Sequence, residues 1–492
     1  MSVNAYAKLL KELACFTQTK YSVLSRDIGY DTSYISKWIT GERLPAAKNV
    51  DCINQKFSKI FSEIIIKNHR KKEFFHKFMV SEVSSEEEMV FQVYQCLSNA
   101  YRGSLNRPNN YNQVNFENES LVMGRMNCRT LLQKMLKYKL EDLSTPVSIV
   151  ITGEFCSLAN NHFWQLFEDV NINIFPCSIH VMLDLSNLGI NGNENIGKLY
   201  HCLDKLLDYN IYIYEQSSIA YQNIIVVENK FAIIYLMNED GYIDMCVPVV
   251  NPVQVQMIYN KCKSLIMTQP ILLLPKETLG MDRFGYRDTF FTSNRFFFFL
   301  TNGFEFLLPD EVFKRLYANT EKGLYKPATK EWVQRIEVIW KNLMDKAELH
   351  FILPTNAIIR YLETGYIHIT DISYQLSKDE RLLHIKQILS VMNLNHNIIL
   401  GVLLPSVKAY RNENVLNLSF YSNYSTAFFK KNLNYINEKT FPIYLVDNPI
   451  FLQYIQNYFE SQKESLYYKE YSDTQLSELY KRYHFLLDFL DS

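Results

Sequence analysis

Six polar side chains near the amino terminus have the chemistry needed to contact a nucleic acid. They are short hydroxyl groups, one phenol and two cations, and they all fall within residues 32–43: Thr32, Ser33, Tyr34, Ser36, Lys37 and Arg43. Hydroxyl groups exchange hydrogen bonds with base edges, whereas lysine and arginine pair with phosphate oxygens. This combination predicts contacts to double-stranded DNA, provided that the chain places the six side chains on one exposed face.

The residues around this group predict two short helices joined by a tight turn. Apolar spacing favours a first helix over about residues 21–28, and Gly29 ends it because glycine adopts a left-handed conformation without strain. Asp31, Thr32 and Ser33 offer N-capping side chains for a second helix over about residues 32–40. The predicted buried face of this second helix consists of Ile35, Trp38 and Ile39. Such a pair matches the geometry that places a second helix in the major groove.

The motif resembles the Cro/C1-type (XRE) helix-turn-helix family. Three runs carry the resemblance, namely Leu24 to Gly29, Ser33 to Trp38 and Gly41 to Pro45. The resemblance covers only the amino-terminal part of the chain. It implies that Thr32, Ser33, Tyr34 and Lys37 face the DNA groove. The alternative is a helical hairpin that makes contacts with another protein.

Three positions depart from the pattern of that family. Ser25 stands where the family usually has alanine, and Tyr21 stands where it often has a glutamine that touches phosphate. Ile39 stands where an acidic residue is common. We expect the serine at position 25 to have little effect on the fold. Tyr21 is expected to remove one contact to the DNA phosphate backbone, and Ile39 is expected to alter the packing of the second helix.

Charge is distributed unevenly along the chain, although the formal net charge is only -1. Residues 1–77 hold 14 basic and 7 acidic residues, a net charge of +7, whereas the remainder holds 37 basic and 45 acidic residues, a net charge of -8. This asymmetry indicates that only the amino-terminal segment meets a polyanion. The basic run at residues 69–73 either adds non-specific phosphate affinity or is a solvated face.

Length and composition favour a folded protein of more than one domain. The chain has 492 residues, of which 48% are hydrophobic and 14% aromatic, so packed cores are expected and wholesale disorder is excluded. Nine cysteines without a Cys-x-x-Cys pair are typical of a reduced compartment. No secretory signal and no membrane-spanning run is visible, so we expect a cytoplasmic protein without a membrane partner.

The predicted architecture is an all-α head followed by a duplicated two-lobed α/β body with a C-terminal helix. Strands alternate with helices in the body, which predicts largely parallel strands with an added antiparallel hairpin. A further β-hairpin is predicted at Asn302-Gly303, because Asn-Gly favours a two-residue turn. The predicted divisions are a helix-turn-helix domain (1–65), a helical connector (66–118), a first lobe (119–270), an inter-lobe segment with that hairpin (271–327), a second lobe (328–465) and a C-terminal helix (466–492).

Matched residues support the duplication. Five identities recur at an offset of 197 residues: Asn251, Pro252, Gln256, Asn260 and Ser264 match Asn448, Pro449, Gln453, Asn457 and Ser461. Asparagine caps a helix and proline occupies its first position, which gives two of the five matches a local physical reason. The repeat period is too long for a solenoid and predicts two lobes.

The two-lobed layout is similar to that of the phospholipase D superfamily. Each lobe of that family carries His-x-Lys, four further residues and Asp on a hairpin, with His as nucleophile and Lys as phosphate ligand. The matching positions of the first lobe are Tyr221, Asn223 and Glu228, and the segment 416–422 of the second lobe holds neither His nor Lys. The resemblance therefore implies a scaffold that has lost its catalytic groups.

Other searches for chemistry return little. The ten histidines include no His-x-x-x-His spacing, and there is no Gly-x-x-x-x-Gly-Lys phosphate loop. Thr152-Gly153-Glu154 follows a predicted strand, where ligands often bind, but a turn is the simpler explanation. We expect no cofactor, no metal and no enzymatic activity.

The sequence predicts a sequence-specific DNA-binding transcriptional regulator with a large C-terminal body for sensing or dimerisation. A homodimer is expected because one small DNA-binding unit makes few contacts, and the effector would be a small molecule or a peptide. Two alternatives stay open. One is a phospholipase D-like phosphodiesterase fused to a DNA-targeting head, and the other is an antitoxin-type protein-interaction module.

Overall fold

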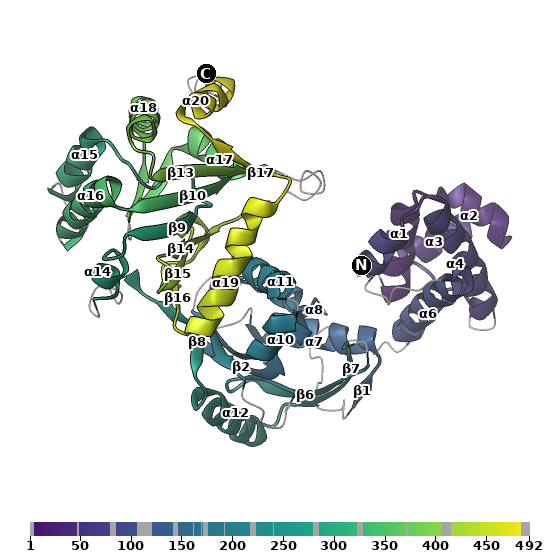
Figure 1. The fold of residues 1–492 in the computed structure, drawn as a ribbon. Coiled ribbons are helices and arrows are strands. Elements are labelled where there is room, and N and C mark those ends of the chain that lie inside the picture. Colours follow the sequence, from purple (N-terminus) through teal and green to yellow (C-terminus); the bar gives the residue numbers. More distant parts are fainter. Residues whose placement is uncertain are drawn as a thin grey trace. The chain divides into compact units, whose positions relative to one another are not determined.

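The chain folds into two compact units, Met1–Asn115 and Phe116–Ser492, called the N-terminal unit and the body below (Figure 1). The first is helical, and the second is a mixed α/β structure, which confirms the predicted fold class. This computed structural model describes residues 4–46, 49–78, 85–105, 121–140, 146–160, 162–168, 170, 176–190, 192–216, 223–239, 241–278, 285–321, 328–369, 372–404 and 415–483.

Helices of the N-terminal unit surround one apolar core. Tyr6, Leu10, Ile35, Phe57 and Phe61 are buried together at its centre. The aromatic rings of Phe57 and Phe61 stack with their centroids 5.7 Å apart, one turn apart on the same helix face. The helices of this unit are α1 (Ala5–Thr17), α2 (Tyr21–Ile28), α3 (Thr32–Thr40), α4 (Val50–Lys67), α5 (Lys71–Phe78) and α6 (Glu86–Leu105).

The helical part of the predicted connector, 66–118, belongs to this core and is not a separate element. Helix α6 packs along α1 and α4. The backbone N–H of Tyr6 donates to Ser104 Oγ (3.0 Å), and the Tyr101 hydroxyl donates to the carbonyl of Pro45 (2.7 Å). The buried face of α6 consists of Met89, Val93, Leu97 and Tyr101. Sequence spacing identified this helix but not the surface against which it packs.

The described strands of the body form one 15-stranded mixed sheet and a separate two-stranded sheet of β11 (Tyr366–Ile369) and β12 (Ile372–Gln375). The first lobe supplies β1 (Val122–Met123), β2 (Val147–Glu154), β3 (Cys177–Leu183), β4 (Tyr209–Glu215), β5 (Ile224–Val227), β6 (Phe231–Met237), β7 (Ile243–Val249) and β8 (Ile271–Lys276). The second lobe supplies β9 (Arg295–Phe299), β10 (Glu348–Pro354), β13 (Ile398–Leu403), β14 (Leu418–Ser422), β15 (Ala427–Lys431), β16 (Ile443–Val446) and β17 (Tyr468–Tyr471).

Helices cover both faces of this sheet (Figure 1). Those of the first lobe are α7 (Arg125–Leu140), α8 (Phe155–Asn160), α9 (Gln165–Glu168), α10 (Leu185–Ile190), α11 (Gly192–Lys205) and α12 (Pro252–Met267). Those of the second lobe are α14 (Tyr286–Phe290), α15 (Asp310–Glu321), α16 (Ala328–Lys346), α17 (Thr355–Thr364), α18 (Lys378–Leu394), α19 (Pro449–Ser461) and α20 (Asp473–Tyr483).

Seven neighbouring strands repeat the same order in the two lobes, as the predicted duplication requires. The order is β7-β6-β5-β2-β3-β4-β8 in the first lobe and β16-β15-β14-β9-β10-β13-β17 in the second. In each run the first three pairs are antiparallel, the next two are parallel and the last is antiparallel. The prediction of largely parallel strands was therefore wrong, because parallel pairing is confined to the centre of each repeat.

The matched asparagines of the two lobes perform the same structural task. Asn251 Oδ1 accepts from the N–H groups of the second and third residues of α12 at 3.1 and 3.2 Å. Asn448 Oδ1 accepts from the corresponding groups of α19 at 2.9 and 3.0 Å. Pro252 and Pro449 each occupy the first helical position. The capping explanation of these identities is confirmed.

The predicted hairpin at Asn302-Gly303 is wrong. Strand β9 is the first strand of the second repeat and pairs with β10 in parallel and with β14 antiparallel. Both of its edges are therefore occupied, and residues 304–308 form no strand. Position 303 still favours glycine, because its φ is 83° and because a Cβ there would lie 2.5 Å from the Cβ of Tyr361. The second repeat begins at β9, inside the segment predicted to lie between the lobes.

The two lobes join through one continuous sheet. Strand β8 pairs with β16 antiparallel, and α11 packs against α19 (Figure 1). The ammonium of Lys431, which is fully buried, donates to the carbonyls of Leu207 (2.8 Å) and Tyr209 (2.9 Å) in the first lobe. Burial lowers the pKa of Lys431 well below its ordinary value. The two lobes therefore form one packed unit and are not separate domains joined by a linker.

The last described helix packs on the body. Helix α20 contacts α18, and its Leu476 is buried in the core of the second lobe. The predicted C-terminal helix (466–492) is present over residues 473–483. Residues 468–471 of that segment form strand β17 instead, because they pair with β13, and residues 484–492 lie outside the described residues.

A fragment of residues 1–115 is expected to unfold cooperatively on its own, whereas a fragment of residues 1–65 is not. Removal of α6 exposes the core against which four large side chains pack, and each such side chain contributes roughly 1.5–3 kcal/mol when buried. That loss is comparable to the whole stability of a small domain, about 5–15 kcal/mol. Thermal melting followed by circular dichroism tests this, and a sigmoidal transition for the shorter fragment would contradict it.

Candidate nucleic-acid interface

The turn between α2 and α3 is held by a glycine conformation and by hydrogen bonds. Gly29 ends α2 with a φ of 83°, and its N–H donates to the carbonyl of Ser25 (3.0 Å). The hydroxyl of Ser25 donates to the carbonyl of Tyr30 (2.6 Å), and the Tyr30 hydroxyl accepts from Asn49 Nδ2 (3.1 Å). These contacts fix the direction in which α3 leaves the turn.

Caps at both ends set the length of α3. Asp31 accepts the backbone N–H of Ser33 at 2.8 Å, and hydrogen bonds from the backbone and then the side chain of Ser33 lower the pKa of that carboxyl. Gly41 ends the helix with a φ of 81°, where a side chain would lie 3.4 Å from the methyl group of Ala7. The helix therefore offers about two and a half turns, at 3.6 residues per turn, for contacts with a partner.

One side of α3 is buried in the core. Ile35, Trp38 and Ile39 are only 0%, 3% and 2% exposed. The ring of Tyr30 meets that of Trp38 edge to face, with centroids 5.0 Å apart. Since the residues of a helix are divided between its two sides by the 3.6 period, this burial determines which side chains face outward.

The predicted site residues lie on the other side. Thr32, Ser33 and Tyr34 are exposed, and Tyr34 is 47% exposed. Ser36 and Lys37 are half-buried. Arg43 is exposed just beyond the helix, where its backbone N–H donates to the carbonyl of Lys37 (3.2 Å). All six side chains are accessible from outside, and their contact with DNA stays a prediction.

The three departures from the family pattern each have a place in the structure. The Ser25 hydroxyl makes a hydrogen bond to the turn that alanine cannot make. Ile39 is buried, so an acidic side chain there would lack solvent, and isoleucine adds to the core instead. Tyr21 is 37% exposed at the start of α2, where its hydroxyl keeps one hydrogen-bonding group at the surface.

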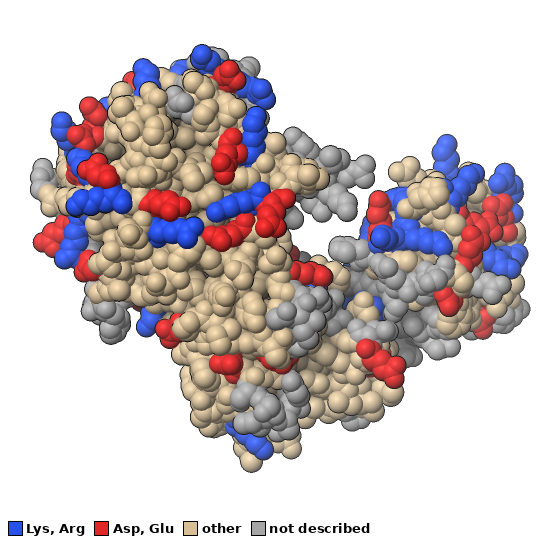
Figure 2. All heavy atoms as spheres, viewed as in Figure 1, with Lys and Arg blue, Asp and Glu red and all other residues tan. Residues whose placement is uncertain are grey.

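Charges of both signs surround the exposed side of α3. Asp31 and Glu42 are exposed beside the predicted contacts, and Arg26 is paired with Asp27 at 3.0 Å. On the face drawn in Figure 2, basic and acidic side chains of the N-terminal unit lie next to one another. The exposed side of α3 is therefore not part of a uniformly basic surface.

The hairpins of the body do not carry the phospholipase D motif at the described positions. Asn223 precedes β5 and Glu228 follows it, and Tyr221 lies outside the described residues. In the second lobe, β14 consists of Leu-Ser-Phe-Tyr-Ser, with all five residues buried. Side chains of these kinds supply neither an imidazole nucleophile nor a phosphate-binding ammonium.

The segment Thr152-Gly153-Glu154 has a structural explanation. The Thr152 hydroxyl accepts the backbone N–H of Ile224 (3.1 Å), and a Cβ at Gly153 would lie 1.9 Å from the hydroxyl of Tyr235. Glu154 caps α8 by accepting from two backbone N–H groups, those of Cys156 and Ser157. This stretch is the end of β2 and not a turn, and its side chains have structural contacts.

Within the part of the chain that the structure describes, no three His, Cys, Asp or Glu residues come together in a way that could hold a metal ion. None of the described helices combines the length and the apolar character needed to cross a bilayer.

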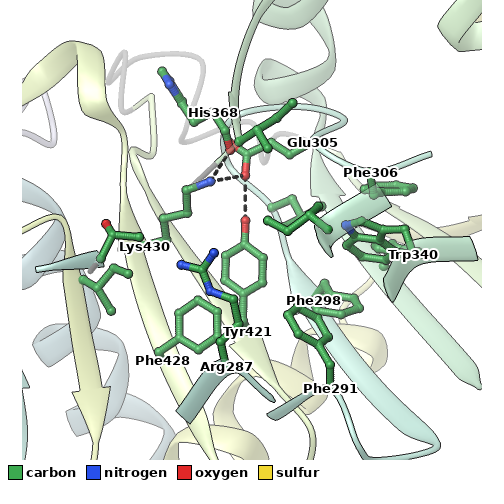
Figure 3. Close-up of a pocket in the computed structure, with 16 residues that line it drawn as sticks. Arg287, Phe291, Phe298, Glu305, Phe306, Trp340, His368, Tyr421, Phe428 and Lys430 are labelled. Atoms are coloured by element: carbon green, nitrogen blue, oxygen red, sulfur yellow. Dashed lines mark hydrogen bonds and ion pairs between the residues drawn. The ribbon is translucent and has the colours of Figure 1, made fainter. Parts of the chain in front are cut away.

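Sequence reasoning missed a buried polar cluster in the second lobe. Lys430 and Tyr421 both contact the carboxylate of Glu305, beside a cavity (Figure 3). A sequence signal existed, because Glu305 is the only acidic residue in the strongly apolar run from Phe296 to Leu308. A single charge in such a run calls for a partner, but the partner residues are more than 100 positions away.

Replacement of Gly29 by alanine is expected to destabilise the N-terminal unit by about 1 kcal/mol. No atom lies within 4 Å of a Cβ at this position, so the cost comes from the left-handed backbone alone. Gly29→Asn is the matched control and should cost less, because asparagine tolerates this conformation. Urea unfolding of the 1–115 fragment measures both, and an unchanged midpoint for Gly29→Ala would refute the assigned turn.

The comparisons with known proteins leave the family open. No protein-family model matches the chain, and no curated protein matches it. One similar solved structure is TrmBL2, described as an archaeal chromatin protein with a novel mode of DNA binding; the identity is 11%, the TM-score is 0.21, and the match covers 46% of this chain and 71% of that one. Another is phosphatidylserine synthase of Haemophilus influenzae, with 8% identity, a TM-score of 0.25 and coverage of 76% and 92%. At such scores neither similarity carries an argument about function.

Proposed function

We propose that this protein is a sequence-specific DNA-binding transcriptional regulator that inserts α3 into the major groove. The observation that carries the proposal is the division of α3 into a buried apolar side and an outer polar side. Ile35, Trp38 and Ile39 anchor the helix, and the outer side holds hydroxyl groups and a cation. A rigid helix with short polar side chains suits the width of a major groove.

The side chains have distinct roles in this proposal. Ser33 and Tyr34, with Thr32 and Ser36, exchange hydrogen bonds with base edges and determine sequence preference. Lys37 and Arg43 pair with phosphates and determine position on the duplex. The acidic Asp31 occupies the amino end of α3, so anion binding there falls to side chains and not to the helix terminus.

The body supplies the second half of the proposed mechanism. Two copies of α3 on one palindromic site double the contacts of a single small unit, so a homodimer is the expected form. Dimerisation through the body would set the spacing of the two N-terminal units. An effector that binds the body would then change affinity for DNA by favouring one spacing over another.

Lys37→Ala is expected to weaken binding by a similar factor on every DNA sequence. Loss of one phosphate contact should also reduce the slope of log affinity against log salt by about one. Lys67→Ala, in the last turn of α4, removes the same charge outside α3 and is the control. Fluorescence anisotropy on the selected site and on unrelated duplexes measures both variants. Equal losses for Lys37→Ala and Lys67→Ala would indicate a general charge effect and not a contact of α3.

Replacement of Ser33 or Tyr34 by alanine is expected to change which sequence is preferred. Loss of a base contact costs about 1–3 kcal/mol at one position and relaxes preference there. Selection of bound duplexes from a random pool, carried out in parallel for the wild type and each variant, reveals the change. If the triple variant at Ser33, Tyr34 and Lys37 still bound the wild-type site, the proposed role of α3 would be wrong.

A further inference from the structure

The second lobe contains a cavity of about 90 Å³ between its sheet and α16. One end is polar and the rest is aromatic. Figure 3 shows Lys430 and Tyr421 converging on Glu305, with Phe298, Phe306 and Trp340 on the side away from Lys430. The cavity lies apart from the predicted DNA contacts, which belong to the N-terminal unit.

The polar end holds a buried carboxylate in its charged form. Glu305 Oε2 accepts from Lys430 Nζ (2.9 Å) and from the Tyr421 hydroxyl (2.7 Å), and Lys430 also donates to the carbonyl of His368. Burial, the largest single influence, would raise the pKa of Glu305, but the nearby charges and the hydrogen bonds from Lys430 and Tyr421 together outweigh it, and the pKa lies below its ordinary value. Glu305 therefore stays an acceptor at neutral pH.

One acceptor atom at this end has no partner among the described residues, namely Glu305 Oε1. His368 reaches this end through its backbone carbonyl, which accepts from Lys430, whereas its ring is directed away from Glu305 in Figure 3. The ring nitrogen Nε2 of His368 lies 2.9 Å from Asn432 Oδ1, outside the cavity lining. A buried acceptor without a donor favours a ligand that brings one.

The walls favour a small planar ring. The rings of Phe306 and Phe351 stack with centroids 3.8 Å apart, and those of Phe298 and Phe351 with centroids 5.0 Å apart. Trp340 extends this aromatic surface. The volume of about 90 Å³ limits a ligand to a small molecule of about one ring.

Two of the segments that supply the polar end have no counterpart in the first lobe. Glu305 lies in residues 300–309, which join β9 to α15, whereas β2 of the first lobe runs directly into α8. His368 lies on β11 of the two-stranded sheet between α17 and α18, whereas α10 and α11 are separated by a single residue. Lys430 and Tyr421 lie on strands of the repeated order, so the carboxylate of Glu305 is added to the repeated fold and its two partners are not.

We propose that this cavity is a binding site for a small, neutral, planar molecule that carries N–H or O–H donors. A cationic ligand is disfavoured because Lys430 already neutralises Glu305 and Arg287 also lines the cavity. A donor of the ligand pairs with Glu305 Oε1, and its ring lies against Phe298, Phe306 and Trp340. This inference goes beyond the proposed DNA binding and does not depend on it.

Phenol and toluene are the matched probes, because they share one ring and differ in a hydroxyl against a methyl group. Isothermal titration of the full-length protein, without DNA, is expected to give phenol a Kd on the order of 1 mM. Toluene should bind at least about tenfold more weakly, because it leaves Glu305 Oε1 unpaired. Equal affinities for the two probes, or no binding of either, would overturn the proposal.

Two variants locate the binding. Glu305→Gln should reduce the preference for phenol to less than about threefold, because the charged acceptor is lost. Ile336→Trp fills the cavity from α16, a surface helix, and should abolish binding of both probes while leaving the melting temperature near that of the wild type. If Glu305→Gln fails to fold, the Ile336→Trp variant alone tests the proposal. Phenol binding to the Ile336→Trp variant with wild-type affinity would show that the binding site is not this cavity.

Discussion

Burial of three apolar side chains on one side of α3 is the constraint on which the account of this protein depends. Ile35, Trp38 and Ile39 are removed from water and cannot rotate outward without loss of the core. Gly29 and the Ser25–Tyr30 hydrogen bond fix the angle at which α3 enters that core. The polar side therefore points outward as a consequence of packing. Because α3 is fixed in the core, the polar side chains on its outer side can be held in one position against a duplex.

The body combines one repeated scaffold with features found in a single lobe. The repeated strand order and the paired caps at Asn251 and Asn448 show that the two halves share one architecture. Buried contacts such as those of Lys431 then bind the halves into one unit. The second lobe adds the segments that carry Glu305 and His368. Ligand binding in the second lobe could therefore shift the packed elements around it. A close-packed interior has little free space in which a small local shift could be absorbed.

Features encoded by neighbouring residues could be predicted from the sequence. The ends of α2 and α3 follow from Gly29, Asp31 and Gly41, and the structure has them where the local pattern indicates. The caps of α12 and α19 are local for the same reason. The placement of the five candidate residues of α3 on the side away from the core followed from the 3.6 period of the helix. In these cases each signal lies within one helical turn of the feature that it determines.

Features that depend on distant partners could not be predicted. The run from Phe296 to Leu308 has the pattern of a hairpin, yet β9 pairs with β10 and β14, which are about 50 and 120 residues away. Helix α6 was identified, but its packing on α1 was not, because amphipathic spacing does not name a partner. The Glu305–Lys430 pair escaped for the same reason, since 125 residues separate the two side chains.

Methylation interference on the selected duplex tests the central claim most directly. Methyl groups on guanine N7 lie in the major groove, and those on adenine N3 lie in the minor groove. If α3 occupies the major groove, N7 methylation within the site should block binding, and the blocked position should change when Tyr34 is replaced. Interference only from adenine N3, or from neither, would contradict the account, since the outer side of α3 would then not read bases.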